Sequence, residues 1–314
     1  MGEYNIGQFI YRSRKAMGLT QEQMCQDENG NLYFSVETLS RIERGKQRPN
    51  YRTMRYMMRR IGKENCFCAP YLKTADYQVL EMNRELKHAL TINDCESAEK
   101  VLLEIEKRLS LQYATNRQYL IRTHAIIDQQ LKRITSEEAL QLLEIALQLT
   151  VHSYGTERFS YEVLVPEEVV LVCNIAECYG RIGNEEKALE LLGVLSDSMS
   201  NPTLQLNYPD GLFELVTRNR IKWIGEQGKY HDAVRECNKA IQHCIEKGIA
   251  NTLPGLLYAR AYNLQMLKNT SPEWKEYDQK IIDSDYIKCA LLANLFNDDS
   301  GRDKALAKLK QKSS

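Results

Sequence analysis

The sequence predicts an all-α protein, with a short helical domain at its N-terminus followed by a longer array of helical hairpins. The 314 residues include only 7 Pro and 16 Gly, too few for the many turns of a β-sandwich or barrel. Apolar residues recur with helical spacing in one segment after another. Two segments 45 residues apart also repeat the same pattern of helix, glycine turn and helix, which is typical of stacked helical hairpins.

The composition is that of a protein with packed cores, because 43% of the residues are hydrophobic and 27% are charged. No run of 18 apolar residues occurs, and the N-terminus lacks the apolar stretch of a signal peptide. We therefore expect a cytoplasmic protein with no membrane partner. The nine cysteines, an odd number spread over the whole length, are expected to be reduced thiols.

The net charge of zero conceals an asymmetry between the two ends of the chain. Residues 1–65 carry 12 Lys and Arg against 7 Asp and Glu, whereas the remaining residues carry 30 against 35. Between Arg44 and Lys63 there are eight cations and no carboxylate. A basic block on an acidic body favours a polyanion-binding domain, although a solvated helix face would have the same composition.

Four short helices are expected within residues 1–65. The first has Ile6, Phe9, Ile10, Ser13 and Met17 at helical spacing and ends at Gly18. The second begins at a capping box formed by Thr20 and Gln23. The third lies between an N-cap at Ser35 and Gly45, and a fourth, 51–61, turns three methionines and an isoleucine inward. This order of helices is the helix-turn-helix pattern.

Two stretches of this domain resemble the phage-repressor type of helix-turn-helix, the XRE family, which has the lambda-repressor-like fold. They are residues 18–21 and the eleven consecutive residues 39–49, and the resemblance covers roughly residues 5–62. The span from Thr20 to Gly45 is longer than is usual in that family. Its additional residues fall in segment 27–34, which we expect to form a turn with a hydrophobic anchor.

The resemblance assigns roles to individual residues. Gln21 would bind a DNA phosphate, and Arg14 would form an ion pair with Glu43 that locks the first helix against the third. The recognition helix would contact bases through its front and its exposed face, which comprise Ser35, Val36, Glu37, Thr38 and Arg41. The cations that follow it, Lys46, Arg48 and Arg52, would hold the DNA backbone.

Helical geometry supports this assignment independently of the resemblance. Glu37 and Arg41 are four residues apart, on the face opposite the apolar residues of the third helix. Arginine can bind guanine through two hydrogen bonds, and glutamate can accept one from cytosine N4. Cations just beyond such a helix can neutralise phosphates.

The rest of the chain contains degenerate hairpin repeats. Segments 174–188 and 219–233 align without gaps and resemble the tetratricopeptide repeat, with weaker copies around Ala98 and Ala139. The four alanine anchors, of which the last two are Ala188 and Ala233, lie 41, 49 and 45 residues apart, longer than the standard repeat of about 34 residues. Such hairpins predict a right-handed α-solenoid with a concave inner face.

Two asparagines recur at the same place on the first helices of two repeats, Asn174 and Asn219. An amide side chain carries both donors and an acceptor, so this pair could clamp the backbone of an extended peptide. Arg181 and Lys222 lie near the same face and could bind a carboxylate. The alternative is that both asparagines are ordinary exposed or turn-stabilising residues.

The order of the two regions resembles the peptide-pheromone-responsive regulators of Gram-positive bacteria, the Rgg, PlcR and PrgX (RRNPP) type. The resemblance implies a DNA-binding domain (1–65), a linker (66–75) and a repeat domain (76–314) that binds a short linear peptide and forms a homodimer. Such a dimer would bind a pseudo-palindromic operator in double-stranded DNA. In this interpretation the chain regulates transcription in quorum sensing.

Other functions remain open at this point. The repeats could bind a protein partner or serve only for dimerisation, and a scaffold or phosphatase-like modulator can be built on similar repeats. Cys66 and Cys68 lack the further ligands of a zinc site. No phosphate-binding loop, dinucleotide fingerprint or nucleophile elbow occurs in the sequence. We therefore expect no metal, no cofactor and no enzymatic activity.

Overall fold

The computed structural model describes residues 6–27, 30–47, 49–63, 71–74, 76–92, 94–200, 211–270 and 279–310. Within these ranges all the regular structure is helical, apart from one isolated bridge between Gln26 and Leu32. The chain divides into two compact units. The first holds the described residues of 1–89, 95–172 and 197–207, and the second holds those of 90–94, 173–196 and 208–314.

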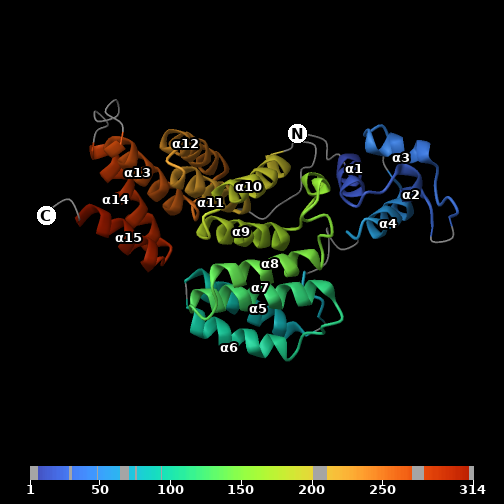
Figure 1. Ribbon diagram of the computed structural model, residues 1–314, viewed down its shortest axis with the longest axis horizontal. Helices are drawn as coiled ribbons and strands as arrows, with labels where there is room; N and C mark the ends of the chain where they lie inside the picture. The colour runs from blue at the N-terminus through green and yellow to red at the C-terminus, as the bar shows by residue number, and fades with distance from the viewer. Residues whose placement is uncertain are drawn as a thin grey trace. The chain divides into compact units, whose positions relative to one another are not determined.

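Four short helices form the N-terminal bundle (Figure 1): α1 (Ile6–Ala16), α2 (Gln21–Cys25), α3 (Val36–Glu43) and α4 (Tyr51–Arg60). The expected caps are present. The Thr20 hydroxyl accepts a hydrogen bond from the Gln23 backbone, and the Gln23 side chain accepts one from Thr20 in return. The Ser35 hydroxyl caps α3 by accepting a hydrogen bond from the Thr38 backbone, without a reciprocal bond to the Ser35 backbone. Gly45 ends α3 with a φ of +70°, a backbone conformation that glycine adopts at little cost.

The core of the bundle comes from all four helices. Its buried residues include Phe9, Ile10, Met24, Leu39, Ile42, Met57, Met58 and Ile61. Helix α1 ends at Ala16, so Met17, which continues the apolar pattern in the sequence, is instead 42% exposed.

The longer turn between α2 and α3 is anchored by aromatic residues, as expected. Phe34 packs against the core of the N-terminal bundle. The rings of Tyr33 and Tyr56 stack with their centroids 4.1 Å apart, and the Tyr56 hydroxyl donates to the carbonyl oxygen of Gln26. These contacts attach the turn to α4.

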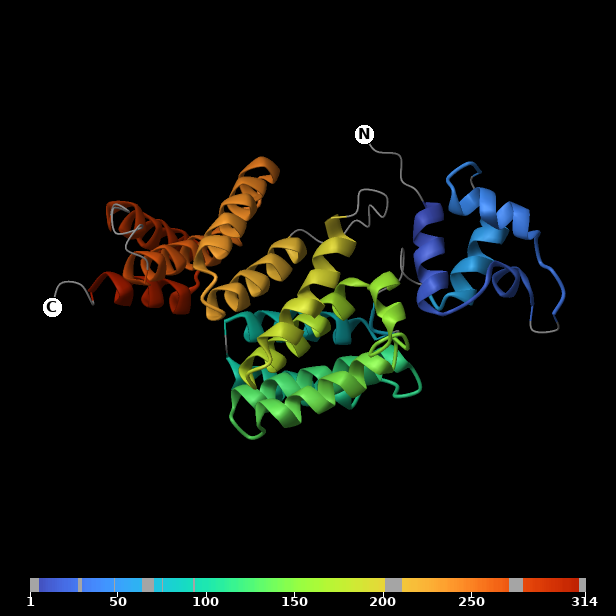
Figure 2. The ribbon, with the colours of Figure 1, turned by 45° about the horizontal axis from the view of Figure 1, so that its top comes forward.

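Two helical hairpins of the first unit lie side by side in both Figure 1 and Figure 2. They are α5 (Tyr77–Thr91) with α6 (Cys95–Glu106), and α7 (Ala114–Gln130) with α8 (Ser136–Gln148). A short 3-10 helix, η1 (Glu157–Tyr161), lies in the connection from α8 to α9 (Pro166–Arg181).

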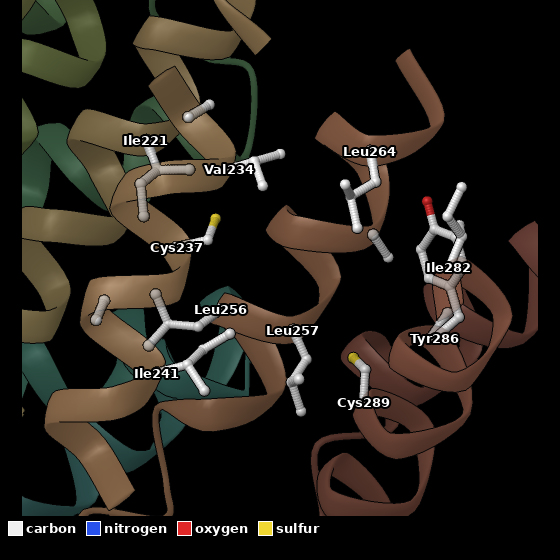
Figure 3. Close-up of a cluster of buried hydrophobic side chains, with 14 of the residues drawn as sticks. Ile221, Val234, Cys237, Ile241, Leu256, Leu257, Leu264, Ile282, Tyr286 and Cys289 are labelled. Atoms are coloured by element: carbon white, nitrogen blue, oxygen red, sulfur yellow. The ribbon is translucent and has the colours of Figure 1, made fainter. Parts of the chain in front are cut away.

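The second unit contains the C-terminal part of α9, most of α10 (Glu185–Ser200), and α11 (Leu212–Glu226), α12 (Tyr230–Lys247), α13 (Leu253–Thr270), α14 (Gln279–Leu295) and α15 (Asp299–Lys310). Figure 3 shows the core in which side chains from α11 to α14 meet, including Ile221, Cys237, Leu256 and Tyr286. Ala305 of α15 closes this core.

The recurring small residues lie where helices come closest. The four anchors Ala98, Ala139, Ala188 and Ala233 are completely buried. Gly180 of α9 lies against Trp223 of α11, where an added Cβ would come within 2.2 Å of the indole ring. The equivalent glycine of the next repeat, Gly225, lies similarly close to the side chain of Asn263. The expected all-α fold with tetratricopeptide-like hairpins is confirmed.

Candidate functional site

Helix α3 presents two charged side chains to solvent. Glu37 and Arg41 are exposed, whereas Leu39 and Ile42 on the opposite face are buried in the core of the N-terminal bundle. Glu37 Oε1 and Arg41 Nη2 are 2.6 Å apart. An exposed pair of this kind on a helix contributes only about 0.3–0.5 kcal/mol, so either group can exchange its partner for another at little cost.

Ser35, Val36 and Thr38, the other three residues expected to contact bases, have structural roles in this conformation. The Ser35 hydroxyl accepts a hydrogen bond from the Thr38 backbone and lies 2.9 Å from the Thr38 hydroxyl. Val36 packs against the core of the bundle. The side chains that α3 can extend furthest toward a ligand are therefore those of Glu37 and Arg41.

A buried charged network connects α1, α2 and α3. Arg14 donates to both carboxylate oxygens of Glu43, at 2.6 and 3.0 Å, and also to the carbonyl oxygen of Leu19 at 2.8 Å. Arg14 and Glu43 are each only 5% exposed. Because a bidentate arginine–carboxylate pair, with two parallel hydrogen bonds, restricts the orientation of both side chains, it holds α3 in place against α1.

Gln21 belongs to the same network, a contact that the motif did not predict. Its amide nitrogen lies 2.7 Å from Glu43 Oε2. A phosphate contact by Gln21, as implied by the resemblance, would therefore use its backbone N–H at the start of α2 or require its side chain to leave Glu43.

The cations after α3 divide into two groups. Lys46 and Arg52 are exposed. Lys46 lies in the turn after α3, and Arg52 lies in the first turn of α4. Arg60 donates to the carbonyl oxygen of Gln23, and Lys63 is buried with two carboxylates near it. The basic surface is therefore smaller than the run of eight cations suggests. Arg48, a further expected phosphate contact, lies outside the described residues.

The four residues expected to bind a peptide lie on α9 and α11, and both asparagines, Asn174 and Asn219, are half-buried. Arg181 and Lys222 come together on a carboxylate of the protein itself. Glu177 Oε1 lies 2.8 Å from Arg181 Nε and 2.6 Å from Lys222 Nζ. The Lys222 ammonium also lies 4.3 Å from the centre of the Trp223 ring.

The sequence reasoning missed Glu177, although its position carries a signal. Glu177 and Lys222 are 45 residues apart, the same offset as the two asparagines. They are therefore equivalent positions of successive repeats, and opposite charges at equivalent positions predict a contact between neighbouring first helices.

The described cysteines are all buried thiols. Burial raises the pKa of the Cys25 thiol to about 11 and that of Cys237 to about 12, so both are protonated at neutral pH. Among the described residues no three His, Cys, Asp or Glu side chains are grouped as metal ligands; Cys66 and Cys68 lie outside these residues. None of the described helices is both long and apolar enough to cross a bilayer.

No protein-family model and no curated protein sequence matches the chain. Solved structures do match it. Bacillus thuringiensis PlcR, in complex with the peptide PapR7 and DNA, has a TM-score of 0.62 at 17% identity, over 96% of this chain and 98% of PlcR. The apo form of PlcR gives 0.57 at 14% identity, with the same coverage.

ComR from S. thermophilus, in complex with DNA and its signalling peptide ComS, has a TM-score of 0.52 at 16% identity. That match covers 98% of this chain and 100% of ComR. The chain is therefore similar in fold, over nearly its whole length, to the PlcR and ComR type of regulator, as its sequence predicts.

Proposed function

We propose that the protein is a transcription regulator that binds specific sequences in double-stranded DNA and is controlled by a short linear peptide bound to its repeats. The observation that carries the proposal is the exposed face of α3. It presents Glu37 and Arg41 opposite a buried apolar face, and the buried pair of Arg14 and Glu43 holds the helix in place.

On this proposal, binding to DNA exchanges one set of contacts for another. Arg41 leaves Glu37 and donates to a guanine in the major groove, while Glu37 is free to accept from a cytosine. Lys46 and Arg52 neutralise phosphates, which adds affinity for any sequence. The complexes of PlcR and ComR with DNA and peptide support this proposal.

The peptide would lie along the first helices α9 and α11. Asn174 and Asn219 would hydrogen-bond the backbone of an extended peptide. A carboxylate of the peptide would bind Arg181 and Lys222, in competition with Glu177. Since Glu177 already neutralises one of the two cations, a ligand with a single negative charge suits the site.

We further propose that the regulator is a cytoplasmic homodimer. Three apolar residues follow each other at intervals of four on α14: Ile287, Leu291 and Leu295, of which the last two are 67% and 71% exposed. Antiparallel pairing with a second copy, centred on residue 289, would place Ile287 against Leu291. The same symmetry would place Lys280 near Asp298, so opposite charges would meet at both ends of the interface.

Selection of bound sequences from a random duplex library, with purified full-length protein, tests the DNA-binding proposal. We expect a two-fold symmetric consensus with half-sites about one helical turn, or a multiple of it, apart. Calorimetric titration with short peptides from the culture medium of the source strain tests the peptide. Wild-type protein should bind one of them, and Asn219→Ala should weaken that binding.

If the bound duplexes show no enriched consensus sequence, sequence-specific DNA recognition is contradicted. Failure of every peptide fraction to bind would instead leave the repeats as a surface for a protein partner or for dimerisation. Analytical ultracentrifugation at micromolar concentration should give a dimer for the wild type and a monomer for Leu291→Lys, because the lysine would place a charge in the apolar interface. A wild-type monomer would contradict the dimer.

A further inference from the structure

One segment outside the N-terminal bundle contacts it closely. Residues 153–165, here called the docking segment, connect α8 to α9 and include η1. Helix η1 packs on α1. Arg12 of α1 donates from Nη2 to the carbonyl oxygen of Ser160 at 2.8 Å, and the Arg158 guanidinium lies against the backbone of Gly18.

The docking segment also contributes to the hydrophobic core of the bundle. Val163 is 1% exposed and belongs to the same buried cluster as Phe9, Leu39 and Met57. A valine buried among these side chains removes apolar surface of the bundle from water, which stabilises the contact. The core of the N-terminal bundle is therefore completed by a residue that lies more than a hundred positions further along the chain.

A buried ionic group provides the third contact. Lys63, just after α4, has its ammonium 3.3 Å from Glu162 Oε1 and 3.6 Å from Glu168 Oε2, and all three side chains are buried. Glu162 accepts a further hydrogen bond from the hydroxyl of Ser153. Glu168 accepts from the hydroxyl of Thr150 and from the backbone of Val165.

Both carboxylates are thus held by groups of the repeat region, and Lys63 is held by both carboxylates. Buried charges are stable only when each has its partners in place. Any rotation of the N-terminal bundle away from the docking segment would separate the Lys63 ammonium from both carboxylates, which would keep only their hydrogen bonds within the repeat region. The arrangement therefore favours a single orientation of the bundle on the first repeats.

We infer that the docking segment is a positioning element for DNA recognition. Lys63, Glu162 and Val163 then fix the orientation of α3 relative to the first repeats without contacting DNA themselves. In a symmetric dimer this orientation is one determinant of the distance between the two recognition helices. The inference rests on the proposed function, because it concerns how that function selects the spacing of half-sites.

The test compares full-length wild type with Lys63→Met, Lys63→Arg and Val163→Ala on two kinds of DNA. One is a duplex with a single selected half-site, and the others carry two half-sites whose separation is varied base pair by base pair. Lys187→Met is the matched control, since Lys187 forms an exposed pair with Glu190.

We expect the wild type to lose about tenfold in affinity when the separation departs from its optimum. Lys63→Met and Val163→Ala should bind the single half-site within about twofold of the wild type, but should lose most of the discrimination between separations. Lys63→Arg should retain part of this discrimination, and Lys187→Met should retain all of it. Unchanged discrimination in Lys63→Met, or a loss of half-site affinity as large as the loss on the full site, would overturn the inference.

Hydrogen exchange of the full-length protein without DNA separates this inference from the proposed function. Lys63→Met should accelerate exchange in α1, in α4 and in the docking segment together, whereas Lys187→Met should not. If α1 and α4 exchange at the wild-type rate in Lys63→Met, the docking segment does not position the bundle, whether or not the protein binds DNA.

Discussion

The N-terminal bundle and the repeats hold their helices together by different means. In the bundle one buried network, Arg14 with Glu43 and Gln21, fixes three helices through directed hydrogen bonds. In the repeats, small residues at recurring positions let helices approach closely, as Gly180 does beneath Trp223. Directed polar contacts fix the positions of individual side chains, as a surface that recognises DNA bases requires. Small residues fix the distance between helix backbones and do not restrict which side chains occupy the surface.

The largest effect should come from breaking the network in the bundle. Glu43→Ala leaves Arg14 buried without its carboxylate and removes the partner of Gln21. Loss of one member of a buried pair costs roughly 3–5 kcal/mol. We expect the opening free energy of α1 and α3 amides, measured by hydrogen exchange, to fall by about this amount while α12 to α14 remain unchanged.

A double-mutant cycle with Arg14→Ala sharpens this result. Both substitutions delete the same interaction, so the combined loss should be well below the sum of the two single losses. Glu37→Ala, which removes an exposed pair, is the control and should change stability by less than about 0.5 kcal/mol. Strictly additive losses at positions 14 and 43 would show that the pair does not hold the helices together.

A smaller effect is expected from the repeats. Gly180→Ala would place a methyl group on the Trp223 ring, and overpacking of this kind costs about 1–3 kcal/mol. Gly193→Ala in α10 is the matched control, because no atom lies within 4 Å of its added Cβ. That control should stabilise its helix by about 0.5–1 kcal/mol. Thermal unfolding followed by circular dichroism should move the two variants in opposite directions, and a shift in the same direction would contradict close packing at Gly180.

The smallest effect distinguishes exposed from buried cations. Lys46→Ala should weaken binding to all DNA sequences alike and reduce the slope of log affinity against log salt by about one. Lys63→Met should leave that slope unchanged on a single half-site, because Lys63 is buried between carboxylates. A slope changed by Lys63→Met would mean that Lys63 reaches a phosphate.

Local patterns in the sequence predicted most of the fold. The caps at Thr20 and Ser35, the left-handed glycine at the end of α3 and the buried alanine anchors all follow from short motifs, because each depends on residues a few positions apart. The contact between Arg14 and Glu43 follows from a motif as well, since the helix-turn-helix fixes the relative position of its helices.

Contacts between distant segments could not be predicted in this way. Lys63 reads as one more cation of a basic run, and only the position of the docking segment brings Glu162 and Glu168 to it. Glu177 reads as an exposed acidic residue from its neighbours in sequence, and only the 45-residue repeat, which makes Glu177 and Lys222 equivalent positions, indicates their contact. In both cases the partner is set by tertiary packing, which the spacing of residues within a short segment does not reveal.

DNA recognition by α3 through Arg41 is tested most directly by one titration. Wild type, Arg41→Ala and Glu37→Gln are compared on the selected operator and on an unrelated duplex at several salt concentrations. We expect Arg41→Ala to lose about 1–3 kcal/mol on the operator with relaxed preference at one base pair, and much less on the unrelated duplex. Glu37→Gln releases Arg41 and removes a negative charge, so it should bind the unrelated duplex more tightly. Equal losses by Arg41→Ala on both duplexes, or none on either, would contradict the reading of DNA by α3.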